Sequence, residues 1–244
     1  MFGLFSRKKN VVDEEQAGWI VEQSAWLDKH IGFPNNPVPL ITPTEHFFSL
    51  PPATGHERAL HIFNEVKQLM GLQAWPCDLE AQDEDIDPRV NDMMIVQNAP
   101  QAPLGTFGVG APEQQRIIIT YSPNSLENPH SLIATFAHEL SHYLLACCDQ
   151  PRLYDEDQEE PLTDLLAIKC GFGLFLANSS FTFSQYSDGI AQGWRTSAQG
   201  YLTEREILFA LMLFMRQNGH ELDAAKPFLK AHLYGVLKKA WGSG

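Results

Sequence analysis

The sequence predicts an α+β protein that is mostly helical, with a small sheet beside one central helix. Apolar residues recur at helical spacing through most of the 244 residues, which predicts helices that each bury one face. Two short runs, Thr106–Val109 and Arg116–Tyr121, are instead rich in β-branched residues and flanked by Gly and Pro, so they are expected to be strands. The hydrophobic content of 44% and charged content of 19% are those of a soluble globular protein.

A polar, turn-rich stretch over residues 75–100 divides the chain. We expect residues 1–100 to form a helical, Pro-rich N-terminal region, either as a separate domain or as part of the same one. Helical spacing predicts two helices in this region, over residues 13–31 and 56–72, and the prolines between them predict extended chain. Residues 101–244 then contain both predicted strands and the central helix.

The central helix is predicted over Ser131–Cys147. Pro129 suits the first helical position, where its missing N–H has no partner to lose, and Asn128 can cap the helix. The apolar residues of this run fall on one broad arc, which predicts a helix with one buried face. The residues of the arc are Leu132, Ile133, Phe136, Ala137, Leu140, Leu144 and Cys147.

The same helix contains the sequence His138-Glu139-Leu140-Ser141-His142, which has the pattern H-E-x-x-H. On a helix, His138 and His142 lie one turn apart on the side opposite the apolar arc, with Glu139 at the edge between the two faces. Two imidazoles in this arrangement can hold a zinc ion, while the glutamate acts on a water molecule. The residue composition predicts roughly 0.02 chance matches in a chain of this length, so the motif indicates a zinc centre.

A catalytic zinc ion needs a third protein ligand, and an acidic run precedes the next apolar segment. Here the sequence resembles the gluzincins, the thermolysin-like zinc metallopeptidases, in which H-E-x-x-H is followed some tens of residues later by a Glu with an Asp four positions on. Glu160 and Asp164 have this spacing, and Glu160 follows His142 by 18 positions. The resemblance implies that Glu160 is the third ligand and that Asp164 orients His138.

Pro161 departs from the family pattern, because a residue before proline is biased away from helical geometry. Glu160 is therefore expected at the start of a helix, whereas the glutamate of the family lies within one. A carboxylate at a helix start is still favoured by the helix dipole. Glu159 and Asp164 remain alternatives for the third ligand.

The resemblance implies a zinc-dependent peptidase with a zincin-like fold over residues 101–244. Glu139 would be the general base that takes a proton from water and passes it to the leaving amine. Tyr154 lies in the loop between the two metal-bearing helices, so it is the implied donor to the developing oxyanion. The alternatives for this donor are Tyr143, Tyr186, Tyr201 and His220. In the family, the strand before the metal helix runs along the cleft and pairs with an extended peptide substrate.

The rest of the chain predicts further helices. The segment Pro161–Asn178 is apolar on nearly every side, so we expect a buried helix, in which Gly171 and Gly173 allow close packing against the first metal helix. Thr203 with Glu206 forms a capping-box pattern for a helix to about Gln217. A last helix is expected over about Glu221–Trp241.

Charge and cysteine content indicate which partners and which cellular compartment to expect. A net charge of −13 argues against nucleic acid and anionic membranes as partners. The four cysteines form no C-x-x-C pair, which favours a reducing compartment, and we expect a cytoplasmic protein without a secretory signal. The longest apolar run, Ile207–Met215, has nine residues, fewer than the roughly 18 of a membrane span.

Two function classes are consistent with these patterns. The first is a zinc-dependent hydrolase, most simply a peptidase acting on peptides or proteins. The second is a non-catalytic zincin-fold protein with a binding or regulatory role, in which the metal is structural. Glu139 favours the enzyme, because a structural metal site needs no base beside an open coordination position.

Overall fold

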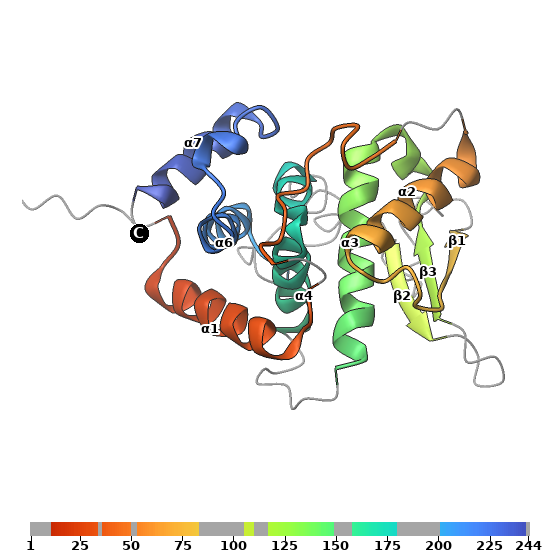
Figure 1. Cartoon of the computed structure of the whole chain (residues 1–244), viewed down its shortest axis with the longest axis horizontal. Helices are drawn as coiled ribbons and strands as arrows, with labels where there is room; N and C mark the ends of the chain where they lie inside the picture. The colour runs from red at the N-terminus through yellow and green to blue at the C-terminus, as the bar shows by residue number, and fades with distance from the viewer. Residues whose placement is uncertain are drawn as a thin grey trace, which may run out of the picture.

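Two long helices lie side by side at the centre of the protein (Figure 1). The structure is a computed structural model that describes residues 11–33, 36–49, 53–82, 105–109, 117–148, 158–179 and 201–242. The central helices are α3 (Pro129–Ala146) and α4 (Glu159–Ala167), and helical chain continues from α4 to Ser179. The other helices are α1 (Glu14–His30), α2 (Gly55–Leu69), α6 (Glu204–Gln217) and α7 (Ala231–Trp241).

The central pair separates two layers of the fold. On one side of α3 lie α2 and a three-stranded sheet, and on the far side of α4 lie α1, α6 and α7 (Figure 1). The strands are β1 (Asp78–Ala81), β2 (Gly105–Val109) and β3 (Ile117–Tyr121). The small sheet beside the central helix is therefore present, and the α+β class is supported.

The sheet has the order β1-β3-β2, with β3 in the middle. The two predicted strands are confirmed as β2 and β3, which pair antiparallel with Phe107 opposite Ile119. Strand β1 was not predicted, because it falls in the stretch expected to be loop. It pairs in parallel with β3, with Leu79 also opposite Ile119. A four-residue strand with charged residues on both sides of one leucine has no local signal, and its partner lies far away in the sequence.

The helix α3 is confirmed with its predicted cap. Asn128 accepts a hydrogen bond from Ser131 N at 3.3 Å, and Pro129 is the first helical residue. The apolar arc is buried except at its end, where Leu144 is only half-buried and Cys147 is exposed. The prediction of a buried face was wrong for this last turn, because there the helix emerges from the core and ends at Cys147.

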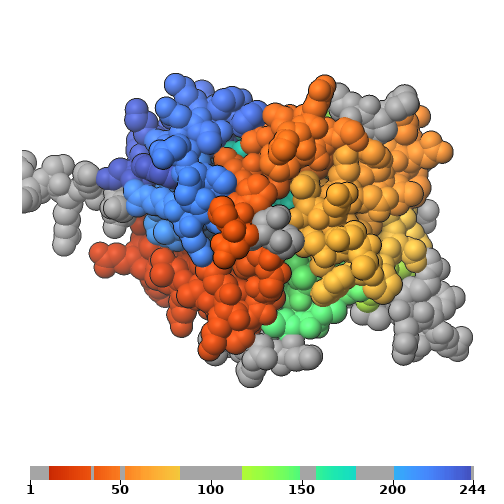
Figure 2. All heavy atoms as spheres, in the orientation of Figure 1, coloured from red at the N-terminus to blue at the C-terminus, as the bar shows by residue number. Residues whose placement is uncertain are grey.

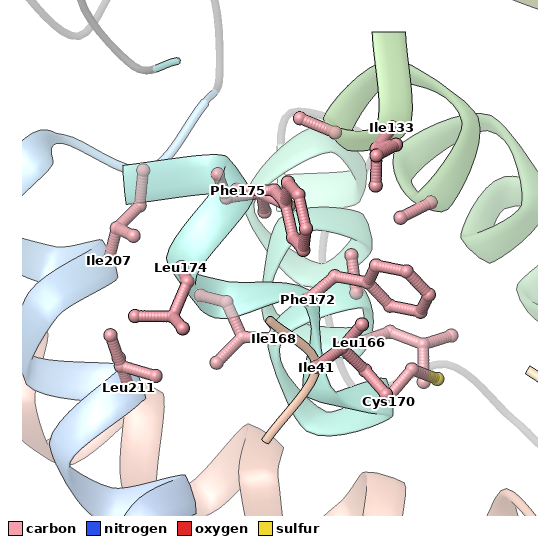
Figure 3. Packing of buried hydrophobic residues seen from close by; sticks show 14 of the residues in the cluster. Ile41, Ile133, Leu166, Ile168, Cys170, Phe172, Leu174, Phe175, Ile207 and Leu211 are labelled. Carbon is pink, nitrogen blue, oxygen red and sulfur yellow. The ribbon is translucent and has the colours of Figure 1, made fainter. Parts of the chain in front are cut away.

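One continuous core joins both layers around the chain that follows α4. Figure 3 shows Ile168 and Leu174 against Ile207 and Leu211 of α6, while Phe172 and Phe175 lie towards Ile133 of α3. Ile41 from the N-terminal part of the chain packs into the same cluster. Residues before and after the stretch 75–100 thus share this core, and the domain boundary predicted near residue 100 lies outside the described residues.

The chain after α4 bends at the π-helical turn Ile168–Phe172. Gly171 has a φ of +100°, and its carbonyl accepts a hydrogen bond from Ile41 N at 3.1 Å. A Cβ at Gly171 would lie 2.4 Å from Pro39 O, so only glycine fits here. The glycines were expected to admit the first metal helix, but this was wrong. Gly171 admits the segment Pro39–Ile41, and Gly173 admits Leu211 of α6.

The C-terminal helices differ in how well the sequence predicts them. The capping box of α6 is confirmed, because Thr203 N donates to Glu206 Oε2 at 2.7 Å and Glu206 N donates to Thr203 Oγ1 at 3.4 Å. The last helix was predicted from about Glu221, but α7 begins only at Ala231. Pro227 explains the later start, because it lacks an N–H and disfavours helical geometry in the residue before it.

The helix Glu159–Ser179 is long and apolar enough to cross a membrane by composition, but 94% of its most apolar window is buried inside the protein. It is the only such helix among the residues that the structure describes. Figure 2 shows why it is buried: the N-terminal third of the chain covers most of the middle of this face, and little of α4 is visible. The helix therefore belongs to the core of this fold.

Candidate metal centre

The two histidines of α3 direct the same ring nitrogen towards one point. His138 is 4% exposed and His142 is half-buried, and their ring centroids lie 4.8 Å apart. The distance between His138 Nε2 and His142 Nε2 is 3.1 Å. Helical spacing alone places the two rings on one side, and the structure adds that both Nε2 atoms converge.

Glu160 in the first turn of α4 completes the cluster. Its Oε2 lies 3.1 Å from His138 Nε2 and 3.5 Å from His142 Nε2. His138, His142 and Glu160 are thus close enough together to hold a metal ion. Glu160 is at the start of its helix and directly precedes Pro161, as predicted, so the positive end of the α4 dipole favours its carboxylate.

The other two candidates for the third ligand face the opposite ring nitrogens. Asp164 Oδ1 lies 2.9 Å from His138 Nδ1, and Glu159 Oε1 lies 3.8 Å from His142 Nδ1. Of the three carboxylates considered from the sequence, Glu160 is the one that approaches both Nε2 atoms. Asp164 is in the position expected for a group that orients His138, and its Oδ2 accepts a second hydrogen bond from Leu202 N at 3.1 Å.

His142 has a partner that sequence reasoning missed. Thr163 Oγ1 lies 3.2 Å from His142 Nδ1 and donates to Glu159 O at 2.8 Å. Thr163 is completely buried between α3 and α4. Its sequence signal is weak, because a threonine three positions after Glu160 is as common in helix packing as in a metal site.

The cluster combines two imidazole nitrogens and one carboxylate oxygen, donor types that bind divalent transition metals. No family model, no curated protein and no solved structure matches this chain. The chemistry that the cluster supports therefore follows from its own donor atoms and their surroundings.

The acidic surroundings change the pKa values of the cluster. Burial lowers the pKa of His138, but hydrogen bonds with Asp164 and Glu160 outweigh burial and raise this pKa to about 10. Burial raises the pKa of Glu160, but the hydrogen bond with His138 and the contact with His142 outweigh burial and hold this pKa well below its usual range. Glu160 is therefore an anion near neutral pH, which suits a metal ligand.

Glu139 lies beside the cluster and is only 6% exposed. Burial raises the pKa of Glu139, the positive charges of His138 and His142 lower it, and the negative charge of Glu160 raises it further. The net effect is an increase. A carboxylate with a raised pKa holds a proton more readily than an ordinary glutamate, which suits a group that takes and returns a proton.

Tyr201, one of the alternatives for the oxyanion donor, lies at the cluster. Its ring centroid is 5.5 Å from that of His138, and the residue is 38% exposed. Burial of the hydroxyl, the negative charges of Glu160, Asp164 and Glu139, and a hydrogen bond with Glu160 together raise the pKa of Tyr201. The hydroxyl therefore keeps its proton at neutral pH.

The remaining candidates for this donor lie elsewhere or outside the described residues. Tyr154 and Tyr186 both lie outside the residues that the structure describes. Tyr143 donates from its hydroxyl to Pro76 O at 3.1 Å, and His220 donates from Nε2 to Val38 O at 2.8 Å. Among the described candidates, Tyr201 is the one that contacts the metal cluster.

Proposed function

We propose that this protein is a zinc-dependent hydrolase, and specifically a peptidase. The observation that carries the proposal is the triangle formed by His138 Nε2, His142 Nε2 and Glu160 Oε2, with sides of 3.1, 3.1 and 3.5 Å. A tetrahedral zinc ion with bonds of about 2.0–2.1 Å has ligands about 3.3 Å apart. The three donor atoms are therefore spaced as three corners of such a tetrahedron.

The donor set supports a catalytic site over a structural one. Structural zinc ions are closed by four protein ligands, whereas catalytic zinc ions keep a fourth position open, and two histidines with one glutamate are a catalytic combination. Within the described residues, the cluster has three members. Non-haem iron also uses two histidines and a carboxylate, but the buried Glu139 beside the cluster is the base that hydrolysis requires.

The chain supplies the proton transfers of peptide hydrolysis. A zinc ion held by His138, His142 and Glu160 would lower the pKa of a water molecule and polarise the scissile carbonyl. Glu139 then accepts the proton of the attacking water and delivers it to the leaving amine. We assign the second oxyanion donor to Tyr201 rather than to Tyr154, because the Tyr201 hydroxyl is protonated and lies beside Glu160.

A peptide substrate fits the sheet beside the metal helix. Strand β3, which precedes the metal helix, is paired on both sides by β1 and β2, so it cannot be the substrate-binding edge strand that the family resemblance implied. Strand β2 is an outer strand of the described sheet and contacts α3. The backbone on the outer side of an edge strand can pair with an extended peptide, so affinity would come from main-chain hydrogen bonds. We propose that a peptide or protein segment binds along β2. The net charge of −13 supports basic or neutral substrates and no role for nucleic acid. We also propose a cytoplasmic location, because the four cysteines form no C-x-x-C pair.

The function is tested by metal content and hydrolysis measured together. Purified protein should contain about one zinc per chain, and His142→Ala and Glu160→Gln should each lose it, because a three-ligand site does not survive the loss of one ligand. Glu139→Gln should keep zinc and lose about 10²–10⁴-fold in peptide hydrolysis, measured on a library of fluorescent peptides.

The metal site and the general base can be refuted separately. Full zinc content in both ligand variants would refute the metal site. Zinc retained with hydrolysis unchanged in Glu139→Gln would remove the base. Stoichiometric iron in place of zinc would move the protein to a different reaction class.

A further inference from the structure

The two histidines of the cluster are held by different kinds of group. Asp164 holds His138 through its Nδ1, at 2.9 Å. No carboxylate among the described residues comes as close to His142 Nδ1, because Glu159 lies at 3.8 Å and the nearer atom is Thr163 Oγ1 at 3.2 Å. The nearest hydrogen-bonding partner of His142 Nδ1 is therefore the hydroxyl of Thr163 and not a carboxylate.

The hydrogen-bond pattern of Thr163 fixes the direction of this contact. A threonine hydroxyl has one proton to donate, and Thr163 donates it to Glu159 O at 2.8 Å. Towards His142 Nδ1 the hydroxyl can then act only as an acceptor, so Nδ1 must carry the proton. The lone pair of His142 is left on Nε2, the atom that lies 3.1 Å from His138 Nε2.

We propose that Thr163 is a positioning residue for the metal centre, which holds His142 in the tautomer and orientation that present Nε2 to the metal ion. This inference rests on the proposed zinc site and extends it. The partner of a ligand imidazole fixes its ring orientation, and removal of such a partner typically costs about 10–100-fold in metal affinity.

Burial strengthens the role of this hydroxyl. Thr163 is completely buried, so water cannot readily replace the hydroxyl as the acceptor for His142. The Thr163 backbone is also fixed, because it lies in α4 between Glu160 and Asp164. One turn of α4 therefore supplies Glu160 to the ion, Asp164 to the first histidine and Thr163 to the second.

The test compares Thr163→Val, which keeps the shape and removes the hydroxyl, with Thr163→Ser, which keeps the hydroxyl. Thr135→Val is the matched control, because Thr135 of α3 is equally buried and donates to the carbonyl four residues earlier, Ser131 O, at 3.1 Å. Zinc affinity is measured by competition with a chromophoric chelator. Thr163→Val should lose about 10–100-fold, while Thr163→Ser and Thr135→Val stay within about twofold of wild type.

A second measurement determines the tautomer of the His142 ring in the absence of added zinc. Two-dimensional nitrogen-15 NMR reports which ring nitrogen of His142 carries the proton. A His142→Gln variant assigns the signal. Wild type should show the proton on Nδ1, and Thr163→Val should shift the population towards Nε2.

The outcomes separate this inference from the proposed function. Wild-type zinc affinity in Thr163→Val, or an equal loss in Thr135→Val, would overturn the positioning role while leaving the zinc site intact. An unchanged tautomer in Thr163→Val would overturn it as well. A wild-type protein that binds no zinc would overturn the metal centre itself, and with it the role of Thr163 in metal binding.

Discussion

The two halves of the helix Glu159–Ser179 are built from different chemistry. Its first two turns present Glu160, Thr163 and Asp164 to the histidines of α3, and the carboxylates of Glu160 and Asp164 are paired with imidazoles. The middle of the helix, around Gly171, is buried and bent over the segment Pro39–Ile41, and it is apolar except for Lys169, which pairs with Asp28 at 2.7 Å. The difference indicates that one end of the helix serves metal binding and the other serves stability, so substitutions should separate the two properties.

The largest effect on stability is expected from Gly171→Ala. The residue has a φ of +100°, and the new Cβ would lie 2.4 Å from Pro39 O, so the strain and the clash should together cost roughly 3 kcal/mol or more. Urea unfolding measures this loss. Gly235→Ala in α7 is the control, because nothing lies within 4 Å of its Cβ, and it should stabilise by up to about 1 kcal/mol.

Gly171→Ala also tests whether metal binding and stability are separable properties of this helix. Zinc affinity per folded molecule should be unchanged in Gly171→Ala, because the bend is not part of the metal cluster. A protein that remains folded but binds zinc much more weakly would show that the bend sets the position of Glu160. Stability equal to that of wild type would show that the bend does not anchor the helix.

A smaller effect, located at the polar end, is expected from Asp164→Ala. Zinc affinity should fall by about 10–100-fold, because His138 loses the acceptor that orients it. The Leu202 N–H also loses its acceptor, at a cost of roughly 1–3 kcal/mol in unfolding free energy. Competition titration and urea unfolding measure the two losses. Glu159→Gln, in the same turn but 3.8 Å from His142, should leave zinc affinity within about twofold of wild type.

Zinc affinity is also expected to depend on pH, which requires no substitution. Asp164 and Glu160 raise the pKa of His138 to about 10 against the opposing effect of burial. A cation that binds Nε2 must displace this proton, so affinity should rise with pH, by about tenfold per unit below that pKa, and level off above it. Chelator competition at a series of pH values measures the slope. A flat profile between about pH 6.5 and 8.5 would mean that metal binding displaces no proton from His138.

Features encoded within one or two turns of chain could be predicted from the sequence. The cap and start of α3, the capping box of α6 and the convergence of His138 with His142 all depend on spacings of three or four residues. The position of Glu160 at a helix start followed from the proline after it. Its proximity to the histidines came from the family resemblance, because no local spacing links residues 18 positions apart.

Features that depend on distant partners could not be predicted. Strand β1 forms because β3 offers it a free edge, and the bend at Gly171 exists because Pro39 and Ile41 pass over it. The role of Thr163 requires a hydroxyl to meet an imidazole of another helix. Tyr201 could be named from the sequence only as one of several candidates, since its approach to His138 depends on how the chain enters α6.

The chain that enters α6 is linked to the metal cluster through Asp164. Leu202 N donates a hydrogen bond to Asp164 Oδ2, and Asp164 Oδ1 is hydrogen-bonded to His138 Nδ1. Tyr201, the neighbour of Leu202, stands against that same imidazole. Displacement of Tyr201 would therefore act on the hydrogen bond of its neighbour Leu202 with Asp164, the carboxylate that orients the His138 ring. Access to the His138 ring and the orientation of that ring thus depend on the same two neighbouring residues, Tyr201 and Leu202.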